Sequence, residues 1–374
     1  MALFKKDKNQ ISSYFIQSSH DDFDKNNIFD LLNVPSAKIG LYDSLAKNIP
    51  ILDAAVSKIA RLCMGFDIEC KDKNAQKMLK EFKENMVVGA GMVGMDNFIF
   101  SYIYNMLLYG TAVGEIILDA DKTKVLGALN HSLDKVLVKK GKSTLDYFYC
   151  NNNSVLSSPF KYQNLFFHSS FNAKPGSVYG QSLLDGLDFV GDILLKIFKS
   201  IGQNFQRAGD IRYCVSLNDK GGDISAEKKA KNMAQMWSKT MSKSSDGRVS
   251  DFIAVGDVKV SAIGADNQIL DSEVPVRQLL EQIISKTGLP PFLLGLNWST
   301  TDRMSTVYAD ILTTELWCIR RMIEPVIVKI LKMALSFNGI FEKVNIVWDD
   351  ISLLDEVEAA KAKYYLAKAG EKIE

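Results

Sequence analysis

One long amphipathic segment constrains the fold of this 374-residue chain most. Between positions 180 and 208 apolar residues recur in steps of three and four, the spacing of one face of an α-helix. Ser182 and Asp185 resemble a capping box at its start. Such a helix would span roughly 35–40 Å. The apolar stripe comprises Leu183, Leu187, Val190, Leu194, Ile197, Ile201 and Phe205.

Two later segments also predict helices. Residues 273–288 carry Pro275 in the first turn and Gly288 just past the end, the usual order of helix start and stop signals. Residues 305–337 predict a long helix that Pro325 should kink. Its apolar stripe comprises Leu312, Leu316, Ile319, Ile323, Ile327 and Ile330.

The remaining segments mix helices with short strands. Residues 1–40 are polar and predict a loosely ordered arm, whereas 41–179 and 338–374 alternate helical and strand-like patterns. Residues 209–272 contain the strand IRYCVSL, the basic helix SAEKKAKNMAQMWSKTM and a hairpin around Gly256 and Asp257. The sequence therefore predicts an α+β fold in which a small α/β insert is carried on two helices.

The overall charge excludes strong, unspecific attraction to nucleic acid. Lys and Arg number 45 and Asp and Glu 44, whereas a protein that grips DNA through its phosphates usually has a basic excess. The five cysteines form no CxxC pair, the N-terminus has no apolar run after its lysines, and no apolar stretch is long enough for a membrane span. We therefore expect no zinc site, signal peptide or membrane span.

Three glycines in MVVGAGMVGMDNFIF match the GxGxxG pattern of a dinucleotide-binding turn: Gly89, Gly91 and Gly94. Only MVV could supply the preceding strand, and no alternation of strand and helix follows to build a parallel sheet. We therefore favour a flexible connection between two helices. An enzyme that binds a nucleotide cofactor at Gly89–Gly94 stays as the alternative.

Other short motifs predict no chemistry. GKST at 141–144 lacks the first glycine of a phosphate-binding loop, since position 136 is Val136, and its surroundings indicate a turn between strands. The histidines are far apart in sequence, and His168 is expected to be a hydrogen-bonded strand residue. They are His20, His131 and His168. The sequence predicts no catalytic, cofactor-binding or metal-binding residues.

Two polar sets remain as candidate binding surfaces. The basic helix of the insert could face a partner or be a solvated surface; its lysines are Lys228, Lys229, Lys231 and Lys239. In SKTGLPPFLLGLNWSTTDRMST, Gly288 and two prolines should end the helix, and FLLGL should anchor the turn. Trp298 could be packed or exposed. The hydroxyl-rich loop that follows comprises Asn297, Trp298, Ser299, Thr300, Thr301, Asp302 and Arg303.

The order of these segments resembles that of tailed-bacteriophage portal proteins. LLYGTAVGEI is similar to the family's glycine-containing entry into a strand. FFHSSFNAKPGSVYGQSLLDGL is similar to its strand, loop and entry into a stem helix, and ISKTGLPPFLLGL to the end of its second stem helix. The resemblance runs from about Pro50 to Ala369.

The resemblance implies a fold and its parts. Residues 1–40 would be an arm, 41–179 and 338–374 the wing, 180–208 and 273–288 the two stem helices, and 209–272 the clip. Residues 289–304 would be the tunnel loop, with the kinked helix 305–337 behind it. Many relatives continue into a helical crown, which would be minimal or missing here.

The resemblance also implies a function without catalysis. Portals form rings, usually of twelve subunits, at one capsid vertex, and double-stranded DNA passes through them during packaging and ejection. Implied partners are the terminase large subunit, the head-tail connector, and the major capsid and scaffolding proteins. The protein would reside in the virion and, during assembly, in the host cytoplasm. No cofactor or membrane is implied, and another phage structural protein with the same helical layout is a further alternative.

A conduit that lets DNA slide explains the balanced charge, because strong phosphate contacts would slow passage. On this interpretation Lys196, Lys199 and Gln203 are candidates to face the channel from the first stem helix. Arg303 would be a weakly held positive group of the tunnel loop.

Overall fold

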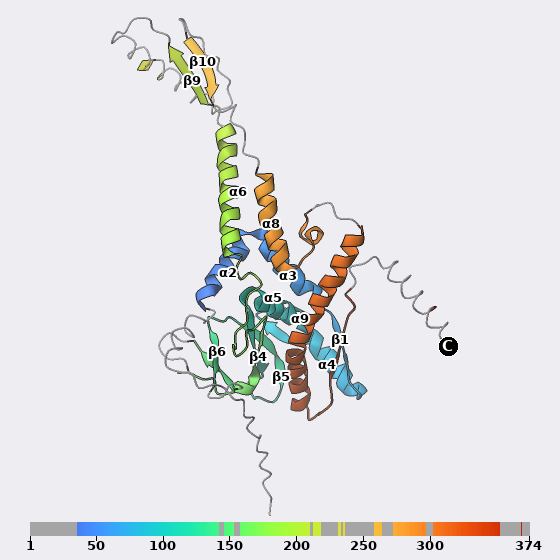
Figure 1. Cartoon of the computed structure of the whole chain (residues 1–374). Helices are drawn as coiled ribbons and strands as arrows, with labels where there is room; N and C mark the ends of the chain where they lie inside the picture. Colours follow the sequence, from blue (N-terminus) through green and yellow to red (C-terminus); the bar gives the residue numbers. More distant parts are fainter. Residues whose placement is uncertain are drawn as a thin grey trace, which may run out of the picture. The chain divides into compact units, whose positions relative to one another are not determined.

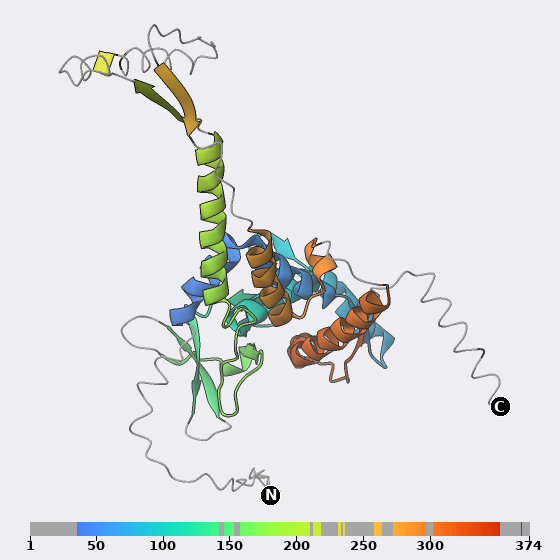
Figure 2. The same ribbon diagram turned by 45° about the horizontal axis from the view of Figure 1, so that its top comes forward.

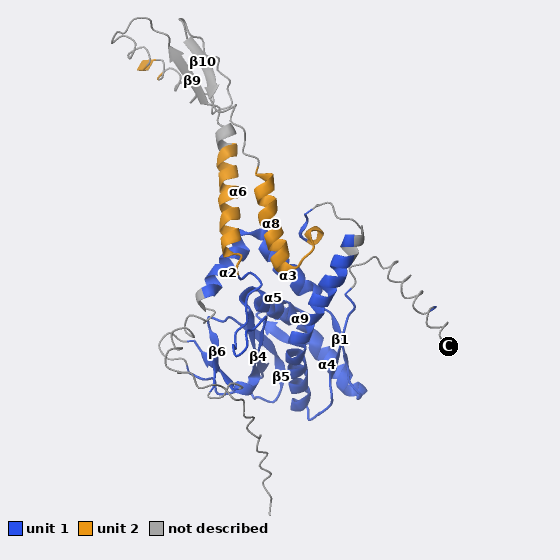
Figure 3. Cartoon of the chain, viewed as in Figure 1, with its two compact units in different colours: residues 1–185, 294–374 blue, residues 186–293 orange. Residues whose placement is uncertain are grey.

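The computed structural model describes residues 36–141, 146–152, 158–209, 212–217, 231–232, 235, 258–263, 272–296, 302–351 and 368. The chain divides into two compact units (Figure 3). One comprises residues 1–185 and 294–374, and the other residues 186–293. Helices and strands are mixed in the first unit (Figure 1), which confirms the α+β class.

The first unit contains most of the regular structure. Its helices are α2 (Ser36–Asn48), α3 (Pro50–Leu62), α4 (Lys73–Asn85), α5 (Met95–Tyr109) and α9 (Asp302–Phe337), with a short 3-10 helix η1 (Gln163–Leu165). Its strands are β1 (Phe66–Glu69), β2 (Val87–Gly89), β3 (Met92–Val93), β4 (Thr111–Leu118), β5 (Val125–His131), β6 (Val136–Lys140), β7 (Tyr147–Asn151), β8 (Phe166–Ser170) and β11 (Asn345–Trp348).

A five-stranded sheet with the order β3-β2-β5-β4-β8 is the centre of this unit. Its described strand pairs are antiparallel except β2 with β5. Helix α5 packs against β4 and β5. Its Tyr102 is buried and donates from its hydroxyl to the Ala112 carbonyl oxygen at 3.3 Å, and it lies 3.1 Å from Ser169 Oγ. Burial of aromatic side chains such as Tyr102 and Phe98 supplies much of the stabilisation here.

The segment that leads toward α6 (Asp188–Gly209) is fixed by two glycines. Gly110 ends α5 in the left-handed conformation with φ +80°, and Gly180 passes so close that an added Cβ would lie 2.2 Å from the Gly110 oxygen. The Gly180 N–H donates to Thr111 Oγ1 at 2.9 Å, and Ser182 Oγ donates to the Leu108 oxygen at 2.6 Å. This lead-in is therefore bound to the end of α5.

The capping box expected at Ser182 and Asp185 is wrong, because α6 begins only at Asp188. Ser182 does cap the local turn, since its Oγ accepts from the Leu184 N–H at 2.9 Å. Asp185 instead forms an ion pair with Lys38 at 3.0 Å and accepts from the Tyr42 hydroxyl at 3.0 Å. Both polar side chains thus attach the chain to α2 and α5 rather than opening the long helix.

A strand that follows α3 and a strand that follows α9 form a small antiparallel sheet. Strand β1 pairs with β11, which brings Phe66 opposite Trp348 with ring centroids 5.5 Å apart. The strand-like pattern expected in 338–374 is confirmed by β11. All six residues of the apolar stripe predicted for α9 are buried, and the helix continues through Pro325. The kink expected there stays a prediction.

The described part of the second unit contains two long helices, a strand pair, a few helical residues at 231–235 and most of the short 3-10 helix η2 (Pro291–Leu294). The long helices and the strand pair are α6, β9 (Arg212–Leu217), β10 (Val258–Ile263) and α8 (Glu273–Thr287). Helices α6 and α8 contact each other and lie side by side in both views (Figures 1 and 2). Strand β10 pairs antiparallel with β9, from Val258 opposite Leu217 to Ile263 opposite Arg212. The other side of the expected hairpin, residues 251–255, lies outside the described residues.

Three helix boundaries differ from the sequence prediction. Helix α2 begins at Ser36, inside the expected arm, and α6 begins at Asp188 rather than at 180. Helix α9 begins at Asp302, so Asp302 and Arg303 belong to a helix and not to the loop predicted for them. Hydroxyl and carboxylate side chains are compatible with both a loop and a first helical turn, which explains this error.

Candidate channel surface

The polar face of α6 carries the three residues expected to face a channel. Lys196, Lys199 and Gln203 are exposed and follow each other in steps of three and four, so they lie on one side of the helix. On the other side, Leu194 is buried and Ile197 is half-buried. With 22 residues, α6 is about 33 Å long. The helix therefore presents a polar strip from Asp192 to Gln203.

The charge on this strip is balanced. Lys196 Nζ lies 2.6 Å from Asp192 Oδ2, one helical turn earlier, and both side chains are largely exposed. An exposed pair of this kind contributes about 0.5 kcal/mol or less to stability. Asp188 adds a second carboxylate in the first turn, opposite in sign to Lys199. The strip therefore offers few unpaired positive charges to a phosphate backbone.

The end of α8 is fixed as the sequence predicted. Gly288 adopts the left-handed conformation with φ +67°, and its N–H donates to the Ile284 oxygen. Thr287 is buried and its hydroxyl donates to the Ile283 oxygen at 2.9 Å. The apolar anchor, however, is Leu289, which is buried, whereas Phe292 is 42% exposed. The expectation that FLLGL as a whole packs the turn is therefore wrong at Phe292.

Most of the predicted loop and clip residues lie outside the described residues. These are the loop residues Asn297, Trp298, Ser299, Thr300 and Thr301 and the clip residues Lys228, Lys229 and Lys239. Lys231 is helical and exposed. The backbone of Asp302 and Arg303 forms the start of α9. The proposed roles of all these residues stay predictions.

The glycine pattern Gly89–Gly94 does not form a dinucleotide-binding turn. Strands β2 and β3 form a hairpin at one edge of the sheet, and the flexible helix-helix connection expected there is wrong as well. Gly94 precedes α5 with φ +92°, and its N–H donates to the Met86 oxygen at 2.9 Å. The alternation of parallel strands and helices that a dinucleotide-binding fold needs is replaced by a mainly antiparallel sheet.

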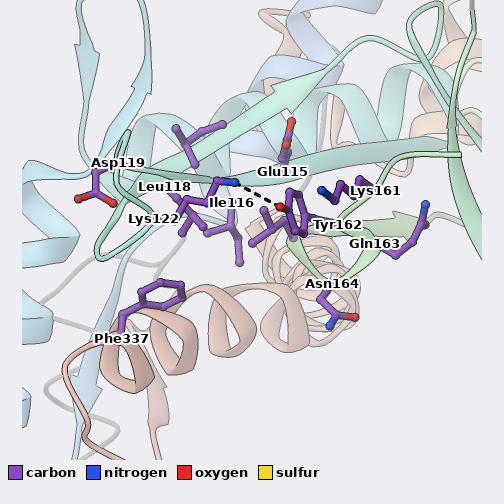
Figure 4. A pocket seen from close by; sticks show the side chains of 12 residues that line it. Glu115, Ile116, Leu118, Asp119, Lys122, Lys161, Tyr162, Gln163, Asn164 and Phe337 are labelled. Carbon is purple, nitrogen blue, oxygen red and sulfur yellow. Dashed lines mark hydrogen bonds between the residues drawn. The ribbon is translucent and has the colours of Figure 1, made fainter.

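A surface depression of about 630 Å³ lies beside β4 and η1 (Figure 4). Its acidic groups already have structural partners: Glu115 Oε2 lies 2.8 Å from His131 Nε2, and Asp119 accepts from the Thr123 and Lys124 N–H groups. The Thr123 hydroxyl, which donates to Asp119 Oδ2 at 2.7 Å, and these backbone hydrogen bonds hold the pKa of Asp119 below its usual value. Among the described residues no group of three or more His, Cys, Asp or Glu is arranged to hold a metal ion.

His168 behaves as the strand residue expected from the sequence. It lies in β8, and its Nδ1 is 2.9 Å from the Tyr149 hydroxyl. Burial lowers its pKa to about 4, with a further contribution from the nearby Lys329. Lys329 in turn donates to the Phe166 oxygen at 2.7 Å and has its own pKa lowered by burial. The group is therefore neutral and structural at neutral pH.

Sequence reasoning missed Arg320 of α9. It is 1% exposed and donates to the carbonyl oxygens of Met64 at 3.0 Å and Asp349 at 2.6 Å. Its guanidinium lies over the rings of Trp317 and Trp348, 5.2 and 5.1 Å from their centroids. The available signal was its spacing, four residues after Leu316 and three before Ile323, which places a charged side chain beside the apolar stripe of the predicted helix.

A search for a helix that could cross a membrane found none in the described part of the chain.

No family model matches the sequence, and no curated protein matches it. Solved structures, however, match the fold of this chain. A chain from the neck of a native gene transfer agent (GTA) particle, computed with C12 symmetry, matches with a TM-score of 0.64 at 12% identity, over 88% of each chain. A chain from the virion of a native GTA particle matches with a TM-score of 0.62 at 14% identity, over 89% of each chain.

A portal protein is also among the matches. It is an HK97 family phage portal protein from Corynebacterium diphtheriae, with a TM-score of 0.42 at 10% identity, over 82% of this chain and 95% of that one. The fold is established by the stronger matches, which span nearly the whole of both chains. This chain shares its fold with a chain of the gene transfer agent neck, and the α+β fold class expected from its sequence is confirmed.

Proposed function

We propose that this chain is a portal subunit that assembles with copies of itself into a ring around double-stranded DNA. The observation that carries the proposal is the fold shared over 88% of the chain with a chain from a neck computed with C12 symmetry. In a closed ring each copy occupies an equivalent position, so one helix face per copy can line a common channel. We therefore propose a ring of twelve subunits at one vertex of a virion.

The polar strip on α6 is proposed to line the channel. Lys196, Lys199 and Gln203 are exposed on one side of a helix whose other side is apolar, and Lys196 is paired with Asp192. Repeated around a ring, this strip gives a polar lining with little net positive charge. DNA can slide along such a lining because each phosphate contact is weak and easily exchanged.

The remaining parts are assigned roles by the same proposal. The segment Asn297–Thr301 contacts DNA, together with Asp302 and Arg303 in the first turn of α9. The clip, with Lys228, Lys229, Lys231 and Lys239, docks the terminase large subunit during packaging and the head-tail connector afterwards. The wing contacts capsid and scaffolding proteins. The protein performs no catalysis, and the energy for translocation comes from a partner.

The proposal is tested by the mass of the assembled protein. Size-exclusion chromatography with light scattering should show a species near 500 kDa, the mass of twelve 41.7 kDa chains, in equilibrium with monomer. Negative-stain images of that fraction should show rings with a central opening. A monomer or dimer that stays unchanged at every protein concentration up to the solubility limit contradicts the proposal.

A further inference from the structure

Helix α9 has a second apolar stripe that points to solvent. Large apolar side chains on its N-terminal half are 37–54% exposed, although a different face of the same helix is fully buried. The stripe comprises Met304, Val307, Tyr308, Ile311, Cys318 and Met322. At 3.6 residues per turn these six positions fall within an arc of roughly 100°. We call this set the outer stripe.

The outer stripe lies beside the buried face of the helix, to which Leu312, Ile319 and Ile323 belong. Asp310 and Arg321 are exposed and make a polar face on its other side, and Glu315 is an exposed carboxylate within the stripe. A surface helix normally has one apolar face of about 100°, so the additional exposed part marks a surface that is covered in the assembled state.

A second exposed apolar set lies elsewhere in the same unit. Met92 and Val93 of β3 are 47% and 55% exposed, and Val87 of β2 is 42% exposed. Strand β3 is the edge of the five-stranded sheet, and α9 packs against β8 at the opposite edge. An exposed apolar edge strand is a liability in a monomer, and natural proteins usually cover it.

We propose that the outer stripe of one copy packs on the β2–β3 hairpin of the next copy. The inference rests on the ring proposed above and identifies the surfaces that close it. A closed ring is built from a heterologous interface, in which each copy uses two different surfaces, one on each side. The outer stripe and the hairpin are two such exposed apolar surfaces, and they lie on separate elements of the same unit.

Cys318 provides a native probe of the outer stripe, because its side chain is exposed whereas Cys63 and Cys150 are buried. Monomer and ring fractions are separated, treated briefly with a maleimide, and digested, and labelling at Cys318 is measured by mass spectrometry. Labelling should be at least about 10-fold slower in the ring. Equal labelling in both fractions overturns the proposal. Slow labelling in the monomer also overturns it, because the same chain would then cover the stripe.

Charge substitutions test which surfaces meet. Ile311→Lys should raise the protein concentration needed for half-assembly at least about 10-fold, because an unpaired charge would be buried in the interface. Val93→Glu should do the same. Asp310→Lys, on the polar face of the same helix, is the matched control and should assemble like the unmodified protein. Circular dichroism and thermal unfolding of the monomer show that each variant is folded.

The double variant Ile311→Lys with Val93→Glu decides the pairing. Each interface then contains one lysine and one glutamate, and assembly should recover most of what either single change loses. Failure to recover overturns the pairing of these two surfaces. If the unmodified protein forms rings and Ile311→Lys forms them equally well, this inference is wrong while the ring itself stands. If the unmodified protein forms no ring, the proposed function fails instead.

Discussion

At the residue scale, a buried arginine joins three parts of the first unit. Arg320 of α9 donates to carbonyl oxygens just beyond α3 and to Asp349 just beyond β11. Carbonyl groups at the end of a helix have no partner within it, so a cation there satisfies them and also complements the helix dipole. The Trp317 and Trp348 rings shield the guanidinium from water. Arg320 therefore fixes α9 to both α3 and the terminal strand.

Replacing this arginine should destabilise the first unit strongly. Arg320→Met keeps much of the apolar contact but leaves the carbonyl oxygens unpaired, and should lower the free energy of unfolding by about 3 kcal/mol. Urea unfolding followed by tryptophan fluorescence measures the change. Arg321→Met, at an exposed position on the same helix, is the matched control and should change it by about 0.5 kcal/mol or less. Equal effects of the two changes would contradict the role of Arg320.

His168 should make the first unit sensitive to acid. Its pKa is about 4 in the fold, below the usual value of 6.5, because burial disfavours the charged form. Between these two pH values the unfolded chain binds the proton and the folded one does not. The stability contributed by neutral His168 is therefore complete above pH 6.5 and is lost as the pH falls toward 4, in total roughly 3 kcal/mol.

The variant His168→Asn tests this dependence. Urea unfolding at pH 7, 6, 5 and 4.5 should show a stability loss in the unmodified protein that is smaller in the variant, with a difference in slope of about 1.4 kcal/mol per pH unit near pH 5. Parallel pH profiles for the two proteins would show that His168 does not carry the acid sensitivity.

At the element scale, helix periodicity was the most reliable guide, and helix starts were the least. The stripe of α9 is buried throughout as predicted, because six apolar residues at helical spacing leave few alternatives. The stripe of α6 was predicted too long. Leu183 and Leu187 are buried before the helix begins, and Phe205 near its end is 60% exposed. The helical spacing of apolar residues begins before α6, in a turn. The hydrogen bonds from Ser182 Oγ to the carbonyl oxygens of Leu107 and Leu108 fix that turn.

The candidate site was predictable only in part. The polar residues of α6 follow from sequence because the periodic pattern separates them from the apolar face. The β2–β3 hairpin could not be predicted from the sequence, since its strands are three and two residues long and give no recognisable alternation of polar and apolar residues. Arg320 was missed for a different reason. Its partners are the carbonyl oxygens of Cys63 and Met64, more than 250 residues away in sequence, and of Asp349, so no local pattern can reveal them.

Alanine substitutions of Gly288, at the end of α8, and of Gly202, inside α6, should change stability in opposite directions. Gly288→Ala forces a side chain into the left-handed conformation that ends α8, and should lower stability by about 1 kcal/mol. Gly202→Ala, inside α6 with nothing near its added Cβ, should raise stability by about 0.5–1 kcal/mol. Amide hydrogen exchange of α6 and α8 measures both changes. Protection that changes in the same direction for both variants would contradict the assigned helix end.

At the scale of the whole molecule, the balanced charge and the shared fold both support the proposed ring around DNA. The chain has a net charge of +1 and a helix with a nearly neutral polar strip. It shares its fold with a chain from a neck computed with C12 symmetry. A ring that encloses DNA does not need a basic groove, because enclosure rather than affinity keeps the DNA in place. We therefore expect the proposed channel to be polar, weakly charged and closed.

Electron cryo-microscopy of the assembled protein tests this account most directly. The account predicts a closed ring with cyclic symmetry, in which Lys196, Lys199 and Gln203 of every copy face the central opening. A ring with these residues on its outer surface, or an assembly with no central opening wide enough for double-stranded DNA, would contradict it.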